Sequence, residues 1–392
     1  MVAKPLTRLW QSIGAVILLI LLLGVTFMLF SSQFGSRPSD DDRHRFKQSK
    51  YYNGSAFVNL SPPAPKDPEV GGWKAAWQFL RGTPNRRPDK GTVAAIPIQP
   101  EALAPVEGPQ LYWFGHSSFM LQWHQRNFLF DPVFADVAAP HPWLGSKRYS
   151  GQLPIQPSDL PHIDAVFISH DHYDHLDLTA IRQLAGKTDR FYVPLGVGTH
   201  LRGWGIEPSR IVELDWWEHT SLNELAITLT PAQHFSGRRP TGQNQSLWGG
   251  WHLKSDDFSL FFSGDTGYSP HFTEIRQRLG AVDFALLECG QYNPAWADIH
   301  MMPEETVKAA RDLEAGVMMP VHWGAFTLSI HAWNEPAQRV VAEAQKQNQA
   351  IVVPRIGERL DLISPPTTIR PWWDVQLQSM TAQEAKGASD YV

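Results

Sequence analysis

The sequence predicts a layered α/β domain, compatible with two sheets and helices outside them, preceded by one transmembrane helix. Three observations support this fold class. Strand-like and helix-like segments alternate from Gln110 to Leu362, several neighbouring strand segments are joined by short turns, and a long apolar segment lies near the amino terminus. The chain has 392 residues, of which 43% are apolar and 19% charged, and this composition excludes wholesale disorder.

Charge and cysteine content exclude several classes of protein. The formal net charge is −5, and no concentrated basic region is present, so we expect no nucleic-acid partner. Cys289 is the only cysteine, which excludes an internal disulfide and a zinc finger built from cysteines. Because Cys289 ends an apolar segment, we expect it to be a small core residue and not a nucleophile.

The amino-terminal segment, residues 1–31, predicts a membrane anchor. Residues 9–30 contain no charged side chain and are long enough to cross a bilayer as a helix. A cleaved signal peptide would have a shorter apolar region followed by a site of small residues, whereas this segment ends in Met28, Leu29 and Phe30. An uncleaved single-pass anchor is therefore favoured.

The orientation of the anchor is less strongly determined by charge. Lys4 and Arg8 precede the apolar segment, and several basic residues between Arg37 and Lys50 follow it, so the positive-inside rule does not decide. The first charges slightly favour a cytoplasmic amino terminus. We therefore expect a bacterial-type inner membrane protein with its catalytic domain on the outer, periplasmic side.

Residues 32–109 are expected to form a polar and proline-rich linker that contains one short helix. Trp73, Trp77 and Leu80 recur at helical spacing within residues 71–81, which predicts an amphipathic helix. The favoured interpretation is that this helix packs on the main domain. The alternative is an interfacial helix beside the membrane.

Residues 110–365 are expected to form the catalytic domain, and residues 366–392 a carboxyl-terminal tail. Apolar and alternating patterns predict strands, listed in order: 111–115, 118–123, 127–131, 164–170, 191–195, 210–216, 225–234, 250–254, 258–265, 282–290, 317–324 and 351–362. His124, Gln125 and Arg126 form the expected turn of the first hairpin. Helices are expected at residues 178–186, at 303–316, where Pro303 opens the helix, and at 335–347.

A dense cluster of metal-capable side chains follows the strand that contains residues 164–169. Its members are His170, Asp171, His172, Asp174 and His175. Holding three imidazoles and two carboxylates so close together is costly without a metal ion, so a purely structural role is disfavoured. His170 and His172 are spaced to share one metal, and Asp174 and His175 can turn toward a second metal about 3.5–4 Å away.

Three further candidates come at the ends of later strands: His234, Asp265 and His322. Each of them alone is compatible with a satisfied core histidine or a turn-forming aspartate. Together with the cluster at 170–175 they predict one site, because strand ends on an α/β scaffold commonly deliver ligands to the same place.

The motifs HDHYDHLD, FSGDTGY and PVHWG, in this order, resemble the metallo-β-lactamase superfamily over roughly Gln110 to Leu362. The resemblance implies an αββα sandwich with two Zn2+ per chain between the sheets. It also implies which residues hold them: His170, His172 and His234 for one ion, Asp174, His175 and His322 for the other, and Asp265 as the bridge.

The segments WFGHSSFML, FDPVF and HWGAF resemble more narrowly the N-acyl-phosphatidylethanolamine phospholipase D branch, to which ascorbate-6-phosphate lactonases are close. This resemblance implies catalytic roles for Asp174, for Tyr173 inside the first motif, and for His300 near the substrate phosphate. Packing remains an alternative for Tyr173, and a capping or solvent-exposed role remains one for His300. His116 is either a site residue or a core histidine. The anchor departs from the pattern of the family.

The resemblance implies hydrolysis of a phospholipid by water that two zinc ions activate, giving phosphatidic acid and an N-acylethanolamine. Two alternatives stay open: hydrolysis of another ester or of a sugar-phosphate lactone, and a metal-binding regulatory protein without activity. The anchor and His300 disfavour a true β-lactamase. The expected partners are the phospholipid substrate and the membrane through residues 9–30, and a homodimer is compatible with the sequence.

Overall fold

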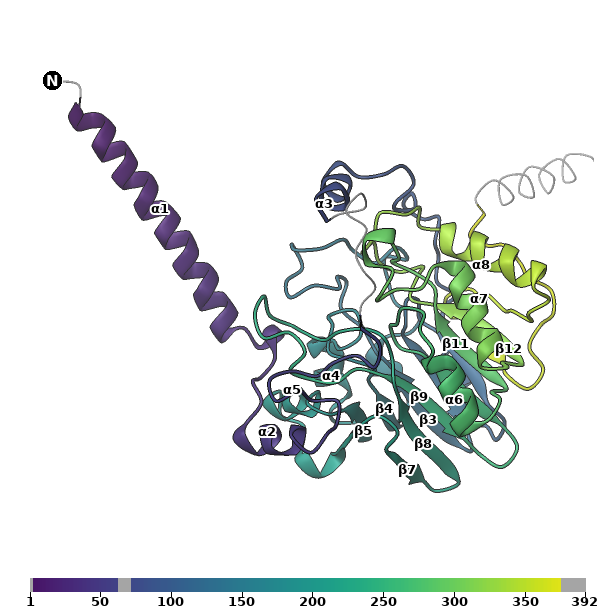
Figure 1. The fold of residues 1–392 in the computed structure, drawn as a ribbon. Helices are drawn as coiled ribbons and strands as arrows, with labels where there is room; N and C mark the ends of the chain where they lie inside the picture. Colours follow the sequence, from purple (N-terminus) through teal and green to yellow (C-terminus); the bar gives the residue numbers. More distant parts are fainter. Residues whose placement is uncertain (1–2, 63–71, 375–392) are drawn as a thin grey trace, which may run out of the picture.

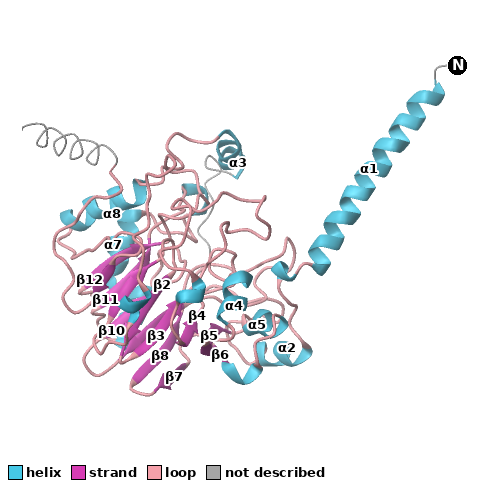
Figure 2. Cartoon of the chain, turned by 180° about the vertical axis from the view of Figure 1, so that it is seen from behind, coloured by secondary structure: helices cyan, strands magenta, loops and turns pink. Residues whose placement is uncertain are grey.

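The computed structural model describes residues 3–62 and 72–374. Two sheets face each other with helices on their outer sides, so the expected αββα sandwich is confirmed (Figures 1 and 2). The seven-stranded sheet has the order β13-β1-β2-β3-β4-β5-β6, and the six-stranded sheet has the order β12-β11-β10-β9-β8-β7. Most of the carboxyl-terminal tail lies outside the described residues.

The strands of the first sheet are β1 (Gln110–Trp113), β2 (Phe119–Trp123), β3 (Arg126–Phe130), β4 (Ile163–Phe167), β5 (Thr188–Pro194), β6 (Ile211–Leu214) and β13 (Arg359–Asp361). Those of the second are β7 (His219–Leu222), β8 (Leu225–Thr230), β9 (Gly250–Lys254), β10 (Ser259–Phe262), β11 (Phe284–Glu288) and β12 (Val317–Val321). The sequence did not predict β7, whose residues alternate without a strong apolar pattern.

Local chemistry explains the hairpins. His124 and Gln125 have φ angles of 51° and 60°, which form a two-residue turn that matches the twist of β2 and β3. Strands β3 to β6 pair in parallel: a long loop connects β3 to β4, and helices connect β4 to β5 and β5 to β6.

The core between the sheets is aromatic. The ring of Phe262 on β10 packs edge-on against Phe119 on β2, with centroids 5.3 Å apart, and Phe167 on β4 packs against Trp251 on β9 at the same centroid distance. All four side chains are fully buried. These contacts fix one sheet against the other and therefore fix the loops at their common edge.

Helices α4 (Leu178–Leu184) and α5 (Gly198–Gly203) cover the first sheet, and α6 (His271–Leu279), α7 (Pro303–Asp312) and α8 (Glu335–Lys346) cover the second (Figure 1). The Asp177 carboxylate caps α4 by accepting hydrogen bonds from the backbone of Thr179 and Ala180. Pro303 begins α7, as expected. Helices α5 and α6 were not predicted, because they are short and lack a long periodic pattern.

The expectation of a linker is wrong for much of residues 32–62. Helix α2 (Asp40–Phe46) lies beside α5 at the β6 edge of the first sheet (Figure 1), and the side chains of Phe46, Tyr51 and Phe57 belong to the main core. These residues pack against partners that lie far away in the sequence. The backbone N–H of Phe57, for example, donates to the carbonyl of Asn244. The polar residues that surround these aromatic residues in the sequence suggested a linker and gave no sign of this packing.

Helix α1 (Ala3–Phe30) extends away from the body (Figure 1). Its segment Leu9–Phe30 has a mean hydropathy of 2.9 and is a candidate membrane span. Helix α3 (Gly72–Arg81) forms where expected, but Trp73 and Leu80 do not pack on the domain. The exposed fractions of Trp73 and Leu80 are 75% and 78%, and Trp73 stacks on Trp77 within the same helix.

Candidate metal centre

Loops that follow four strands bring the candidate ligands to one edge of the sandwich. The loop after β4 carries His170 to His175, and the loops after β8, β10 and β12 carry His234, Asp265 and His322. The strands end slightly before these residues, so the ligands lie in the loops and not in the strands. Strands β8, β10 and β12 run in the same direction within their sheet, so the loops that follow them open at the same edge.

His322 occupies a constrained backbone position. Its φ angle is 67°, and its N–H donates to the carbonyl of His116 at 3.1 Å. A Cβ atom at Gly290 would lie 2.0 Å from the carbonyl oxygen of His322, so a glycine is required beside it. Backbone strain of this kind is frequently found at functional sites.

The first group of candidate ligands consists of His170, His172 and His234. Nδ1 of His172 lies 2.9 Å from Nε2 of His170 and 3.3 Å from Nε2 of His234. Burial lowers the pKa of His170 and of His234 well below the ordinary value, so these imidazoles are neutral at physiological pH. Three converging neutral imidazoles form a suitable site for Zn2+.

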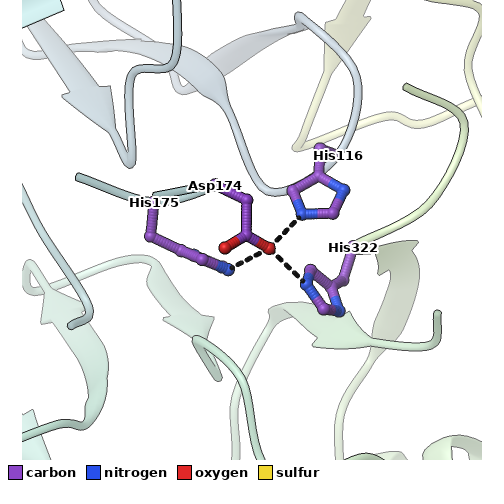
Figure 3. Close-up of side chains that lie close together, drawn as sticks. All are labelled: His116, Asp174, His175 and His322. Atoms are coloured by element: carbon purple, nitrogen blue, oxygen red, sulfur yellow. Dashed lines mark hydrogen bonds and ion pairs between the residues drawn. The ribbon is translucent and has the colours of Figure 1, made fainter. Parts of the chain in front are cut away.

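The second group consists of His116, Asp174, His175 and His322 (Figure 3). Oδ2 of Asp174 lies 2.8 Å from Nε2 of His116, 3.4 Å from Nε2 of His175 and 3.2 Å from Nε2 of His322. His116 was open between a site role and a core role, and the structure brings it into this group. It projects from the turn between β1 and β2 with a φ angle of 55°.

The carboxylates make this part of the site attractive to a cation. Burial alone would lower the pKa of His175 and of His322. The carboxylates of Asp265 and Asp174 outweigh burial and raise the pKa of His175 well above its ordinary value and that of His322 to about 10. The same negative charge that stabilises a proton on these rings would stabilise a metal ion.

Asp265 faces both groups. Its Oδ2 lies 3.1 Å from Nε2 of both His175 and His322, 3.9 Å from Nε2 of His170 and 3.8 Å from Nε2 of His234. Among the described residues, Oδ1 of Asp265 is buried without a hydrogen-bond partner. An unpartnered buried carboxylate oxygen between two imidazole groups fits a site that holds cations.

Asp131 orients His175 from behind. Its Oδ2 lies 2.7 Å from Nδ1 of His175, and its Oδ1 accepts a hydrogen bond from the N–H of Ser169 at 2.7 Å. This contact directs Nε2 of His175 toward Asp265 and Asp174. Sequence reasoning missed Asp131 as a functional residue, although it lies inside the FDPVF segment.

Glu288 holds His300 beside the same centre. Its Oε1 lies 3.0 Å from Nδ1 of His300 and 3.4 Å from Nδ1 of His322, and its Oε2 accepts from the N–H of Met301. Glu288 is completely buried at the end of β11. Sequence reasoning missed it too, and the available signal was a carboxylate at the end of an otherwise apolar strand.

The candidate centre opens into a cleft of about 330 Å³. His172, Asp174, Asp265, His300 and His322 lie on its polar side. The apolar part of its wall consists of Phe235, Trp296, Ile299 and Leu328. His300 therefore faces the cleft, next to the ring of His234 at a centroid distance of 5.2 Å.

The structure places Tyr173 outside this cleft. Its hydroxyl donates to the carbonyl of Arg238 at 2.7 Å, and the Arg238 guanidinium lies over its ring. Burial raises the pKa of Tyr173 to about 12, which keeps the phenol neutral. These contacts favour the packing alternative over the expected catalytic role.

The comparisons with known proteins agree with this geometry. Residues 126–323 match a family model described as a β-lactamase superfamily domain. An uncharacterized protein of Mycobacterium tuberculosis is 40% identical over 342 residues, covering 83% of this chain and 88% of that protein. The mitochondrial N-acyl-phosphatidylethanolamine-hydrolyzing phospholipase D of Saccharomyces cerevisiae is 37% identical over 238 residues, covering 58% of this chain and 50% of that protein.

Among solved structures, a possible metal-dependent hydrolase from Veillonella parvula superposes with a TM-score of 0.53 at 18% identity. The match covers 65% of this chain and 99% of that chain. Similarity at this level of identity concerns the fold alone.

Proposed function

Because the chain belongs to the metallo-β-lactamase superfamily of metal-dependent hydrolases, we propose that it is a membrane-anchored dinuclear zinc phosphodiesterase of the phospholipase D type. Its substrate would be N-acyl-phosphatidylethanolamine or a related phospholipid, and its products phosphatidic acid and N-acylethanolamine. The observation that carries the proposal is the pair of imidazole groups that share Asp265, with His300 beside them in one cleft.

The residues present fit two metal ions. His170, His172 and His234 would hold one ion, Asp174, His175 and His322 the other, and Asp265 would contact both. When bound, two zinc ions supply an activated water at neutral pH and positive charge beside the phosphate. His116 would orient Asp174, because its Nε2 lies 2.8 Å from Oδ2 of that residue.

His300 is proposed as the proton donor or phosphate-binding group. Glu288 contacts Nδ1 of His300, which leaves Nε2 for the cleft. In the reaction, the oxygen of water would form a bond to phosphorus while the bond from phosphorus to the ethanolamine oxygen breaks. A proton from His300 would then neutralise the leaving oxygen, and the proton that the attacking water gives up would restore His300.

The setting of the cleft supports a lipid substrate. Phe235, Trp296 and Leu328 provide apolar contact next to the polar centre. Helix α1 would keep this cleft close to a bilayer, which we propose to be a bacterial inner membrane with the body on the periplasmic side. The named activity of the yeast relative agrees with this substrate class.

The test uses the full chain, purified without chelator in a neutral detergent. It is incubated with N-acyl-phosphatidylethanolamine, unacylated phosphatidylethanolamine, a carboxylic ester and a sugar-phosphate lactone, and the products are identified by mass. We expect phosphatidic acid and N-acylethanolamine from the first substrate, with no products from a His172→Ala control. Carboxylate products alone would support the ester or lactone alternative and refute the proposal.

A further inference from the structure

A second cavity lies where α1 joins the body, and it shares no lining residue with the metal cleft. Its volume is about 210 Å³. One wall is the juxtamembrane segment, defined here as residues 31–43, and the opposite wall is the loop at 237–245. Four arginine side chains line it: Arg37, Arg43, Arg238 and Arg239.

The juxtamembrane segment is held in place by specific contacts. The N–H of Ser36 donates to Nδ1 of His200 at 3.0 Å, and Nε1 of Trp204 donates to the carbonyl of Ser32 at 2.9 Å. Gly35 has a φ angle of 68°, and a Cβ atom there would lie 2.2 Å from Nδ1 of His200. The chain therefore passes close to His200 along a defined path, and the cavity has fixed walls.

The cavity carries unneutralised positive charge. Within residues 3–62 and 72–374, neither Arg37 nor Arg43 forms an ion pair, and both are exposed. Asp171 is the one carboxylate among the lining residues of that part of the chain. It is already engaged, because its Oδ2 lies 3.2 Å from Nε2 of His200 and its Oδ1 accepts from the N–H of Gly237.

Arg238 supplies a buried donor that is not used. Its side chain is only 4% exposed, and its Nη2 has no hydrogen-bond partner among the described residues. Its other donors are satisfied by the carbonyls of Gln33, Asp171 and Leu176. A buried guanidinium with a free N–H group is costly unless an acceptor is supplied, and an anion supplies one.

We propose that this cavity binds a phosphate group, and that the phosphate belongs to an anionic phospholipid. This lipid would lie in the leaflet that contains the carboxyl-terminal end of α1. Arginine guanidinium groups match the geometry and charge of phosphate oxygens. The cavity lies directly beyond Phe30, the last residue of α1, and so at the level expected for lipid headgroups. The choice of a lipid rests on the proposed function in one respect, namely that α1 is a membrane anchor.

Arg238 connects this site with the metal-binding loop. Its Nη1 donates to the carbonyls of Asp171 and Leu176 at 2.7 Å each, and these residues flank the segment that carries His172, Asp174 and His175. A phosphate bound in the cavity would therefore lie against the residue that supports the loop. Headgroup binding and loop position are coupled through one side chain.

The test is a calorimetric titration of the full chain in neutral detergent micelles at constant ionic strength. Three probes are compared: dioctanoyl phosphatidic acid, dioctanoyl phosphatidylcholine and inorganic phosphate. The variant Arg37→Gln/Arg43→Gln removes the two exposed charges of the cavity, and Arg182→Gln/Arg355→Gln is the matched control, since both of these arginines are exposed and lie outside the cavity. Phosphate bound at the metal centre contributes equally to every variant, so only the difference between variants is assigned to the cavity.

We expect the cavity variant to bind phosphatidic acid about tenfold more weakly than the wild type, and the control variant to bind it equally well. If inorganic phosphate competes with phosphatidic acid for the wild type, the cavity also accepts free phosphate. If it does not compete, the cavity is a site for the lipid. Equal affinity of the wild type and the cavity variant for phosphatidic acid and for inorganic phosphate would overturn the proposal.

Two controls keep the result interpretable. The variant Arg37→Lys/Arg43→Lys keeps both charges and should retain most of the affinity, which separates loss of charge from misfolding. Hydrolysis of N-acyl-phosphatidylethanolamine is measured on the same preparations. A wild type that fails to hydrolyse this lipid but shows the charge-dependent binding would refute the proposed activity and leave the phosphate site standing.

Discussion

Most histidines of the candidate centre have one ring nitrogen held by a neighbour, which leaves the other for the site. Nδ1 of His234 lies 3.0 Å from the carbonyl of Ile299, and Nδ1 of His175 lies 2.7 Å from Asp131. Nδ1 of His300 and of His322 both lie near Glu288. This second layer of contacts fixes ring orientation, so the site is organised by residues that would not themselves bind metal.

The first prediction concerns metal content. The two imidazole groups and the shared Asp265 should hold about two zinc ions per chain, and His172→Ala should lose one of them together with nearly all turnover, since His172 contacts both His170 and His234. Elemental analysis of protein purified without chelator measures this. Activity that survives a strong chelator, with well below one metal per chain, would contradict it.

The second prediction separates His300 from the ligands. His300→Ala should keep the wild-type metal content and lower kcat/KM by roughly 10²-fold, the usual loss for one proton donor or one transition-state contact. Steady-state kinetics with metal analysis of the same sample tests this. Loss of metal would instead make His300 a ligand or a support of the fold, and unchanged activity would remove it from the mechanism.

The third prediction concerns Glu288 as a positioning residue for His300. Glu288→Gln removes the negative charge but keeps the shape, and it should lower kcat/KM by about tenfold. The double variant with His300→Ala should then be no slower than His300→Ala alone, because Glu288 acts through His300. Additive losses in this double-mutant cycle would show an independent role, for example through His322.

Sequence reasoning reached the motif residues but not their supports. His170 to His175, His234, Asp265 and His322 were predictable because several metal-capable side chains occur together or at strand ends. Asp131 and Glu288 each stand alone in the sequence. Their contacts with His175 and His300 form only when β3 and β11 bring them close, and such contacts are set by tertiary packing.

At the scale of elements, prediction succeeded where the signal was local. The turn at His124 and Gln125 joins β2 and β3, and Pro303 begins α7, because turn and capping chemistry depend on adjacent residues. Helix α2 was missed although Ser39 and Asp42 form a capping box at its start. Its attachment to the body comes from distant partners: Asp42 pairs with Arg202, and Arg45 with Glu213. Nothing in residues 40–46 by themselves indicates those partners.

The fourth prediction tests how α2 is attached. The Asp42 carboxylate accepts from the N–H of Ser39, from the hydroxyl of Thr199 and from Arg202. Asp42→Asn removes the charge from these contacts and should lower the stability of the fold by about 1–2 kcal/mol at neutral pH, seen as a lower Tm.

The pH dependence of that difference has a definite sign. Burial alone would raise the pKa of Asp42, but the hydrogen bonds from Ser39 and the charge of Arg202 outweigh burial and lower it. A carboxyl group with a lowered pKa contributes stability above its unfolded pKa and loses that contribution as pH falls through the lowered value. The difference in Tm between wild type and variant should therefore shrink below about pH 3.9. A difference that stays constant there would contradict the assignment.

At the scale of the whole molecule, the structured body begins well before the predicted boundary at residue 110. Phe46, Tyr51 and Phe57 share the aromatic core with both sheets, and the N–H of Ile96 donates to the carbonyl of Ile356. The amino-terminal segments therefore connect α1 to the body through packed structure. This path also forms one wall of the arginine-lined cavity, next to the loop that carries His170 to His175.

The fifth prediction compares two truncations that differ in what they remove from this core. Deleting residues 1–30 removes the exposed α1 but keeps the aromatic residues at 46–57, so the product should be soluble and folded, with its metal content intact. Deleting residues 1–109 also removes Phe46, Tyr51 and Phe57, and it should aggregate or unfold, because burial of each such side chain contributes about 1.5–3 kcal/mol. The shorter deletion should lose more activity on bilayer substrate than on detergent-dispersed substrate, since the anchor raises the effective concentration at the surface.

Circular dichroism, metal analysis and parallel assays with vesicles and micelles measure these outcomes. A folded product from the longer deletion would show that residues 40–57 are dispensable to the core, and equal losses on both substrates would argue against α1 as an anchor.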